Sequence, residues 1–190
     1  MILMSMILGY VLIAVFVGME GRMRKTDAAR SWSGGAFDSR STLLNAATFE
    51  FAIFAPLLFD YVQFGLVGYV TVVGSTGLAI MLFGLSIRVW AARTLGEFYT
   101  RTLRVTENQR IVEEGLYRFA RHPGYFGIIL LYTGFGAASA NWIATVAIAA
   151  FTLIAYTYRI NREEAMLIAV FGDRYREYMA RTRKLIPYVY

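Results

Sequence analysis

The chain of 190 residues contains no cysteine and a single histidine, His122. Without cysteine there can be no disulfide, no thiolate nucleophile and no cysteine metal site. Zinc and non-haem iron centres normally use two or more imidazoles, so one histidine argues against them. We therefore expect no metal site.

The composition is too apolar for a soluble domain. Hydrophobic residues make up 57% of the chain and the mean hydropathy is +0.49, whereas a soluble domain has roughly 45–50% apolar residues. The net charge of +6 could indicate a nucleic-acid partner, but in so apolar a chain it indicates membrane topology instead. We expect membrane lipids as partners and no nucleic acid.

Five apolar segments are candidates for transmembrane helices. They are Met1–Met19, Thr42–Phe59, Val62–Trp90, Tyr125–Ser139 and Trp142–Tyr158. The first has no basic region before it and no clear cleavage site, so we interpret it as a retained span and not as a signal peptide. The short turn between the last two predicts an antiparallel hairpin. The predicted fold is all-α and polytopic, with about five transmembrane helices.

The positive charges predict the orientation. All nineteen lysines and arginines fall in three segments, residues 22–40, 88–121 and 159–184. With five spans, these segments lie on one side of the bilayer, which the positive-inside rule assigns to the cytoplasm. We expect the N-terminus outside and the C-terminus in the cytoplasm, in a prokaryotic plasma membrane.

The sequence also predicts the local structure of two segments on the predicted cytoplasmic side of the bilayer. Residues 31–41 read as a polar loop broken at Gly34-Gly35. In residues 162–183 the apolar residues are spaced as in an amphipathic helix that lies on the membrane or folds back over the loops.

The run Arg121-His122-Pro123-Gly124-Tyr125 stands at the mouth of the fourth span. Pro123 suits the first turn of that helix, and the free N–H groups of a helix start favour an anionic ligand group. The alternative interpretation is a belt of basic and aromatic residues that anchors the helix at the interface.

Arg159 and Glu163 are four residues apart on one helical face. They are either an intrahelical ion pair worth about a few tenths of a kcal/mol, or a pair that reaches into a cavity. In a cavity Glu163 would accept from a ligand's cation and Arg159 would hold a carboxylate. Glu50, inside the second span, is either a hydrogen-bonded residue of the bundle interior or part of a polar path.

Taken together, these segments resemble the isoprenylcysteine carboxyl methyltransferase family, which is related to membrane phospholipid N-methyltransferases. The likeness rests on the order and spacing of short motifs over roughly residues 84–187. These are Leu95-Gly96 after Arg88-Val89-Trp90, Gly115-Leu116-Tyr117, Arg121-His122-Pro123-Gly124-Tyr125, Arg159 with Glu163-Glu164, Phe171-Gly172-Asp173-Arg174-Tyr175 with Tyr178, and Leu185-Ile186-Pro187.

The resemblance implies an enzyme that binds S-adenosyl-L-methionine in a cytoplasmic pocket of its C-terminal half. Residues 84–190 would be the methyltransferase core, and residues 1–83 would supply N-terminal transmembrane helices and a cytoplasmic loop. The residues implied to bind the cofactor are Gln109, Arg110, Ile111, Val112, Tyr117, His122, Pro123, Gly124, Tyr125 and Glu163. Arg159 is assigned to the substrate, and Arg159 and Glu163 are the catalytic candidates.

We expect carboxyl methylation of an isoprenylcysteine-like, lipophilic acceptor that enters from the bilayer. Transfer to a carboxylate needs alignment and a dry site more than acid–base chemistry. Methylation of a phospholipid or other amine is the alternative, and it would need Glu163 or His122 to remove a proton. The oligomeric state stays open and a monomer is compatible with the sequence.

Two further readings compete with these. Membrane sterol or enone reductases that use NADPH share an RHP-x-Y-type segment, but they typically carry Asn where this chain has Gly124 and Glu where it has Ile128. A transporter subunit or scaffold would need polar residues near the membrane midplane, where only Glu50 qualifies.

Overall fold

The computed structural model describes residues 2–24, 27–32, 37–38, 40–62, 65–104 and 109–186, and these are helical apart from loops and two isolated β-bridges. The elements are α1 (Ile2–Met23), α2 (Asp27–Arg30), α3 (Ser41–Tyr61), α4 (Val70–Leu95), the short 3₁₀ turns η1 (Gly96–Phe98) and η2 (Gly115–Arg118), α5 (Pro123–Ala138), α6 (Trp142–Phe171) and α7 (Asp173–Arg181). Lys25, Gly34, Gly35 and Pro187, which entered the sequence predictions, lie outside the described residues.

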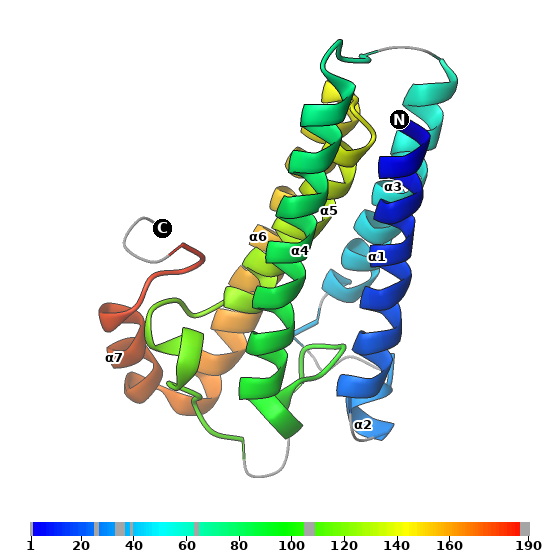
Figure 1. The fold of residues 1–190 in the computed structure, drawn as a ribbon. Coiled ribbons are helices and arrows are strands. Elements are labelled where there is room, and N and C mark those ends of the chain that lie inside the picture. Colours follow the sequence, from blue (N-terminus) through cyan, green and yellow to red (C-terminus); the bar gives the residue numbers. More distant parts are fainter. Residues whose placement is uncertain are drawn as a thin grey trace.

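Five long helices run alongside one another and alternate in direction (Figure 1). In the described part of the chain, α1, α3, α4 and α6 are each long and apolar enough to cross a membrane, and α5 is a shorter apolar helix of 16 residues. The predicted set of five membrane helices is therefore confirmed as a set of helices, with one shorter than a typical span. The fold is that of a multi-pass membrane protein.

The ends of α1, α4 and α6 and the starts of α3 and α5 lie together at one end of the bundle (Figure 1). We call this the basic end, because the described parts of all three arginine-rich segments lie there. The sequence placed these segments on one side of the bilayer, and the alternation of the helices agrees with it. The assignment of the basic end to the cytoplasm stays a prediction.

The third span begins later than predicted, at Val70 and not at Val62. The chain before it is held in an irregular conformation by the turn between α5 and α6. The N–H of Trp142 donates to the carbonyl of Gly65 at 3.0 Å, and the N–H of Val67 donates to the carbonyl of Ala140 at 3.0 Å. Apolar composition alone could not distinguish this paired segment from a helix.

The expected amphipathic helix from Arg162 is wrong in its first half. Residues 162–171 continue α6 without a break, because nothing before Gly172 interrupts the helical sequence. Gly172, with a φ of 55°, ends α6 and begins α7. Only α7 folds back, and it buries Tyr175 and Tyr178 against Ile111.

Helices α4 and α5 pack closely because glycines face each other across their interface. A Cβ atom at Gly84 would lie 2.6 Å from the carbonyl oxygen of Gly127, and one at Gly77 would lie 2.4 Å from the backbone nitrogen of Ala138. This approach brings the basic ends of the two helices together, and it places Arg88 of α4 beside Gly124 in the first turn of α5.

Candidate functional site

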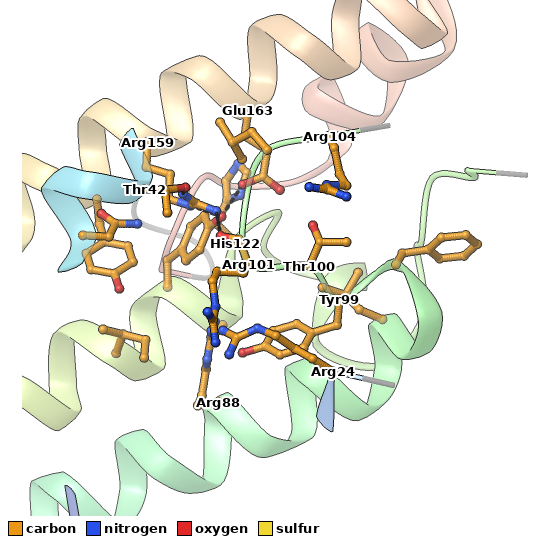
Figure 2. Close-up of a pocket in the computed structure, with 18 of the residues that line it drawn as sticks. Arg24, Thr42, Arg88, Tyr99, Thr100, Arg101, Arg104, His122, Arg159 and Glu163 are labelled. Carbon is orange, nitrogen blue, oxygen red and sulfur yellow. Dashed lines mark hydrogen bonds between the residues drawn. The ribbon is translucent and has the colours of Figure 1, made fainter. Parts of the chain in front are cut away.

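A cavity of about 590 Å³ opens at the basic end, between the ends of the long helices and the loops that join them (Figure 2). Its walls come from α1, α3, α4, α5, α6 and α7. The residues predicted from the sequence that line it are Gln109, Arg110, Ile111, Val112, Tyr117, His122, Gly124, Tyr125, Arg159 and Glu163. Pro123 does not line the cavity. It is buried at the first position of α5, as its chemistry predicted.

The start of α5 is fixed by the C-terminal segment that runs beside it. The backbone N–H of Arg121 donates to the carbonyl of Arg183 at 2.8 Å, and that of His122 donates to the carbonyl of Lys184 at 3.1 Å. The ring of His122 stacks on that of Tyr125, with 5.6 Å between ring centroids and 9° between ring planes. Two aromatic faces are thus held at the cavity wall in a defined orientation.

Arg159 and Glu163 do lie together, but the hydroxyl of Tyr125 stands between them and bonds to both. Arg159 donates from Nε to the Tyr125 oxygen at 2.9 Å, and Tyr125 donates to Oε2 of Glu163 at 2.5 Å. In place of the direct ion pair, one of the two alternatives from the sequence, the structure has a three-residue chain that joins α6 to α5.

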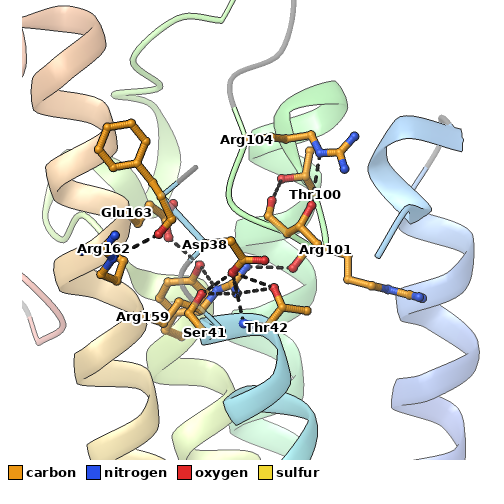
Figure 3. A network of polar contacts seen from close by, with 12 residues as sticks. Asp38, Ser41, Thr42, Thr100, Arg101, Arg104, Arg159, Arg162 and Glu163 are labelled. Carbon is orange, nitrogen blue, oxygen red and sulfur yellow. Dashed lines mark hydrogen bonds and ion pairs between the residues drawn. The ribbon is translucent and has the colours of Figure 1, made fainter. Parts of the chain in front are cut away.

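The other nitrogens of Arg159 connect α6 to the start of α3 and to the loop after α4 (Figure 3). Nη1 donates to the hydroxyls of Thr42 at 3.1 Å and Ser41 at 3.3 Å, and Nη2 donates to the carbonyl of Arg101 at 2.8 Å. Asp38 receives hydrogen bonds from the same two hydroxyls and lies 4.0 Å from the guanidinium. Arg159, which is only 4% exposed, thus holds three parts of the cavity wall together.

The cavity wall opposite Arg159 carries a buried cluster of charged residues that sequence reasoning missed. Glu20 of α1 accepts from Nε of Arg88 in α4 at 2.9 Å, and also from Arg24 and the hydroxyl of Tyr99. The guanidinium carbons of Arg88 and Arg24 lie 4.8 Å and 5.4 Å from the centre of the Tyr99 ring. Burial raises the pKa of Tyr99 well above its ordinary value, so its hydroxyl stays protonated and donates to Glu20. Two arginines face one carboxylate here, which leaves a net positive charge at the cavity.

The segment implied to hold the cofactor is anchored by its two apolar residues. Ile111 packs with Tyr175 and Tyr178 of α7, and Val112 packs with Tyr117 and with Ala91 of α4. Burial raises the pKa of Tyr117 well above its ordinary value, so its hydroxyl remains neutral. The segment thereby forms one wall of the cavity between α4 and α7.

Glu164 has a different environment from its neighbour Glu163. It accepts from Nε of Arg121 at 2.7 Å, and lies 3.3 Å from Nε2 of His122 and 3.6 Å from Nζ of Lys184. Arg121 also donates to two carbonyls near the end of α7. Glu164 therefore ties α6 to the start of α5 and to the C-terminal segment, behind the cavity wall.

Glu50 is not the hydrogen-bonded interior residue that one sequence alternative expected. It is exposed, it lines the cavity from α3, and it makes no ion pair or hydrogen bond to a residue that the structure describes. Glu20 directly follows the predicted first span, next to the basic residues that begin at Arg22, and its partners Arg88 and Tyr99 are far along the chain and could not be inferred.

Comparison with known proteins identifies the part of the chain that supplies most of this site. Residues 77–169 match the model of the isoprenylcysteine carboxyl methyltransferase family. This segment belongs to that family. It runs from the first third of α4 to near the end of α6 and includes Arg88, Arg159, Glu163 and the whole region between Gln109 and Tyr125.

Named relatives agree with the family assignment. A probable protein-S-isoprenylcysteine O-methyltransferase of Oryza sativa subsp. japonica is 32% identical over 122 residues, which are 62% of each chain. Protein-S-isoprenylcysteine O-methyltransferase B of Arabidopsis thaliana is 30% identical over 119 residues, 62% of this chain and 60% of the relative. The human protein of that name is 29% identical over 122 residues, 63% of this chain and 43% of the relative. The chain thus spans less than two thirds of these relatives, all of which are eukaryotic, so a prokaryotic origin stays a prediction.

A solved structure has the same fold. It is described as the eukaryotic intramembrane Ras methyltransferase (isoprenylcysteine carboxyl methyltransferase) and superposes with a TM-score of 0.60 at 21% identity, covering 79% of this chain and 53% of the other. Together with the apolar helices, this shows the fold of an integral, multi-pass membrane protein. Glu20, Arg24, Ser41 and Thr42 lie outside the family segment, so α1 and α3 complete a cavity that the family segment begins. The division at residue 83 falls inside α4 and stays a prediction.

Proposed function

We propose that this chain is an S-adenosyl-L-methionine-dependent methyltransferase that methylates a carboxylate on a lipophilic, isoprenylcysteine-like acceptor. The observation that carries the proposal is the convergence on one cavity of Gln109–Val112, Tyr117, His122, Tyr125 and Glu163. These residues come from segments that are separate in the sequence, and they are the ones that the family resemblance implies for the cofactor.

The chemistry of this wall fits the cofactor. Its ammonium suits the half-buried carboxylate of Glu163, and its carboxylate suits the arginines that line the cavity, since the N–H groups of Tyr125 and Phe126 at the start of α5 already donate to the carbonyl of His122. Its adenine and sulfonium suit aromatic faces, which Tyr117, His122 and Tyr125 supply at the cavity.

When bound, S-adenosyl-L-methionine supplies a methyl group on a positively charged sulfur. The protein's task is to bring a carboxylate oxygen into line with that methyl group and to exclude water. The excess positive charge of Arg24 and Arg88 over Glu20 attracts the carboxylate, and no side chain has to remove a proton from it. Arg159 fixes the positions of Thr42 and Tyr125, and its direct contact with the acceptor stays a prediction.

A lipophilic acceptor also fits the other side of the cavity. Phe16 and Val17 of α1, Ala46 and Phe49 of α3 and Ile128 of α5 line it. These apolar side chains belong to helices that are expected to cross the membrane. An acceptor tail would lie along them with its head group at the basic end.

Calorimetry on the purified protein in detergent tests the cofactor. We expect binding of S-adenosyl-L-methionine and of its demethylated product, and no binding of NADPH. Binding of NADPH alone would favour the reductase alternative.

Methyl-labelled cofactor and N-acetyl-S-farnesyl-cysteine test the reaction. We expect labelled product that releases methanol in mild base, because a carboxyl methyl ester is base-labile. Label in a phospholipid or amine product that is stable to base would instead indicate N-methylation.

A further inference from the structure

A second hollow lies on the outside of the helix bundle, in the groove between α1 and α4, which run side by side in the same direction (Figure 1). Its volume is about 420 Å³, and none of its residues lines the cavity described above. Three of them are exposed, so the groove faces the membrane and not the bundle interior. The residues that line it are Met19 of α1 and Leu85, Ser86, Val89, Trp90 and Arg93 of α4.

The walls of this groove suit a hydrocarbon chain. Leu85, Val89 and Arg93 follow one another at intervals of four residues, so they form one stripe along α4 that is about 12 Å long. Ser86 is the one uncharged polar residue of the groove. Its hydroxyl donates to a backbone carbonyl of its own helix at 2.8 Å, so it presents no unpaired donor to an apolar ligand. The groove is therefore apolar up to Arg93.

The polar end of the groove lies at the level of the lipid head groups. Helix α4 has 26 residues, which span about 39 Å, whereas the hydrocarbon core of a bilayer is about 30 Å thick. The end of α4 that carries Trp90 and Arg93 therefore extends beyond the core, and tryptophan is typical of this interface.

Two arginines flank this polar end. Arg93 is exposed and makes no ion pair or hydrogen bond to a residue that the structure describes, and the same is true of Arg22 in α1. Arg22 follows Met19 by three residues, so it lies on the same face of α1, about one turn nearer the basic end. Other exposed arginines of the basic end, such as Arg176 and Arg181, have acidic partners. Two positive charges without counter-charges thus stand beside the groove.

We propose that this groove binds one anionic phospholipid, with its phosphate between Arg22 and Arg93 and an acyl chain along Leu85 and Val89. The two arginines favour an anionic head group over a zwitterionic one. The apolar stripe favours a lipid over a free phosphate compound, because only the lipid buries hydrocarbon in it.

The position of the groove gives the lipid a structural effect. Met19 directly precedes Glu20, and Val89 directly follows Arg88. The groove thus borders the buried Glu20–Arg88 pair that joins α1 to α4. A lipid that contacts both helices there stabilises their packing, and with it the cavity wall. The site does not depend on the proposed methyl transfer, so it is tested without an activity assay.

Native mass spectrometry of the purified protein in detergent tests the site. The probes are palmitoyl-oleoyl phosphatidylglycerol and phosphatidylcholine, which have the same chains and differ in head-group charge. We expect the parent to retain one phosphatidylglycerol molecule with an affinity about tenfold higher than for phosphatidylcholine. Arg22→Gln and Arg93→Gln should each weaken phosphatidylglycerol binding about fivefold. Arg174→Gln makes the same charge change on α7, away from the groove, and should leave the affinity within about twofold.

Two exposed serines of α4 provide a matched steric test. Ser75 and Ser86 both donate to a backbone carbonyl of their own helix, but only Ser86 lines the groove. Ser86→Phe fills the groove and should weaken both lipids about tenfold or more, since it displaces their hydrocarbon. Ser75→Phe should change neither affinity. Phosphatidylglycerol should raise the unfolding temperature of the parent and of Ser75→Phe, and should not raise that of Ser86→Phe.

Three results would overturn the site. Equal binding of the two lipids by the parent would exclude recognition of the head-group charge. An Arg174→Gln variant as weak as the two groove variants would mean that binding follows net charge. Unchanged binding in Ser86→Phe would place the lipid elsewhere. Arg22→Lys and Arg93→Lys, which keep the charge and should keep the affinity within about twofold, replace the glutamine variants if these do not unfold cooperatively.

Discussion

The hydroxyl of Tyr125 donates a hydrogen bond to Glu163, with 2.5 Å between the two oxygens. The same hydroxyl accepts from Arg159 at 2.9 Å. The two charged residues of α6 are therefore coupled through a side chain of α5, and Arg159 has further partners in α3 and in the loop after α4. Because the coupling is indirect, substitutions of the two residues can have separate effects.

The adjacent glutamates of α6 offer a matched pair of substitutions. Glu163→Gln should weaken cofactor binding about tenfold or more, since a hydrogen bond to a charged group is worth about 1.5–3 kcal/mol. It should leave the thermal unfolding temperature nearly unchanged, because Glu163 is half-buried at the cavity. Calorimetric titration with S-adenosyl-L-methionine measures the first effect, and a thermal unfolding scan in detergent measures the second.

Glu164→Gln should do the reverse. It weakens the contacts to Arg121 and Lys184 that tie α6 to the C-terminal segment, and should cost about 1.5–3 kcal/mol of stability. The unfolding temperature should fall by several degrees while the folded fraction still binds the cofactor. If both variants bind the cofactor like the parent, the assignment of Glu163 is wrong even though the family is right.

Close packing of α4 on α5 gives a prediction about stability. Gly84→Ala places a methyl group 2.6 Å from the carbonyl oxygen of Gly127, and overpacking of this kind costs about 1–3 kcal/mol. Gly18→Ala in α1 is the control, because nothing lies within 4 Å of its Cβ position, and alanine gains up to about 1 kcal/mol over glycine in a helix. Thermal unfolding should show a loss for the first and no loss for the second. Equal effects would mean that the helices do not approach closely at Gly84.

The sequence predicts those features that depend on neighbouring residues, and it misses those that depend on contacts between residues far apart in the chain. The five helices were predicted because a membrane demands long apolar segments, and α5 was placed within two residues because Pro123 marks a helix start. The start of α4 was missed because residues 65–67 are held by the turn before α6, a long-range contact. No local signal marks such a contact.

The same distinction applies to the site. The residues from Gln109 to Glu163 were predicted because they lie within motifs of the family. Glu20 and Asn45 belong to α1 and α3, where no motif was recognised, and their place at the cavity follows only from packing. Glu20 directly follows the predicted span Met1–Met19, beside basic residues, so no local signal distinguished it from an ordinary charged residue at a helix end.

Topology is tested by reporter fusions at the two ends. The three arginine-rich segments share the basic end (Figure 1), and the positive-inside rule places that end in the cytoplasm. A reporter that is active only in the cytoplasm should therefore work at the C-terminus and fail at the N-terminus. The opposite pattern would invert the orientation, and activity at both ends would contradict an odd number of spans.

Arg159 holds the cavity wall together, and substitution can separate this role from its predicted contact with the acceptor. Its guanidinium donates to the side chains of Tyr125 and Thr42 and to the carbonyl of Arg101. Arg159→Ala removes all of these bonds from a buried position and should lower the unfolding temperature by several degrees, as expected for a loss of about 3–5 kcal/mol. Arg159→Lys retains the charge and should recover part of the stability, but not all of it, because lysine cannot donate in several fixed directions. If Arg159 also holds the acceptor's carboxylate, the lysine variant should bind S-adenosyl-L-methionine within about twofold of the parent and lose tenfold or more in kcat/KM for the acceptor. Parallel measurement of unfolding, cofactor binding and methyl transfer distinguishes the cases. A lysine variant with parental turnover would restrict Arg159 to holding the cavity wall, and the carboxylate would then be bound by Arg24 and Arg88 alone.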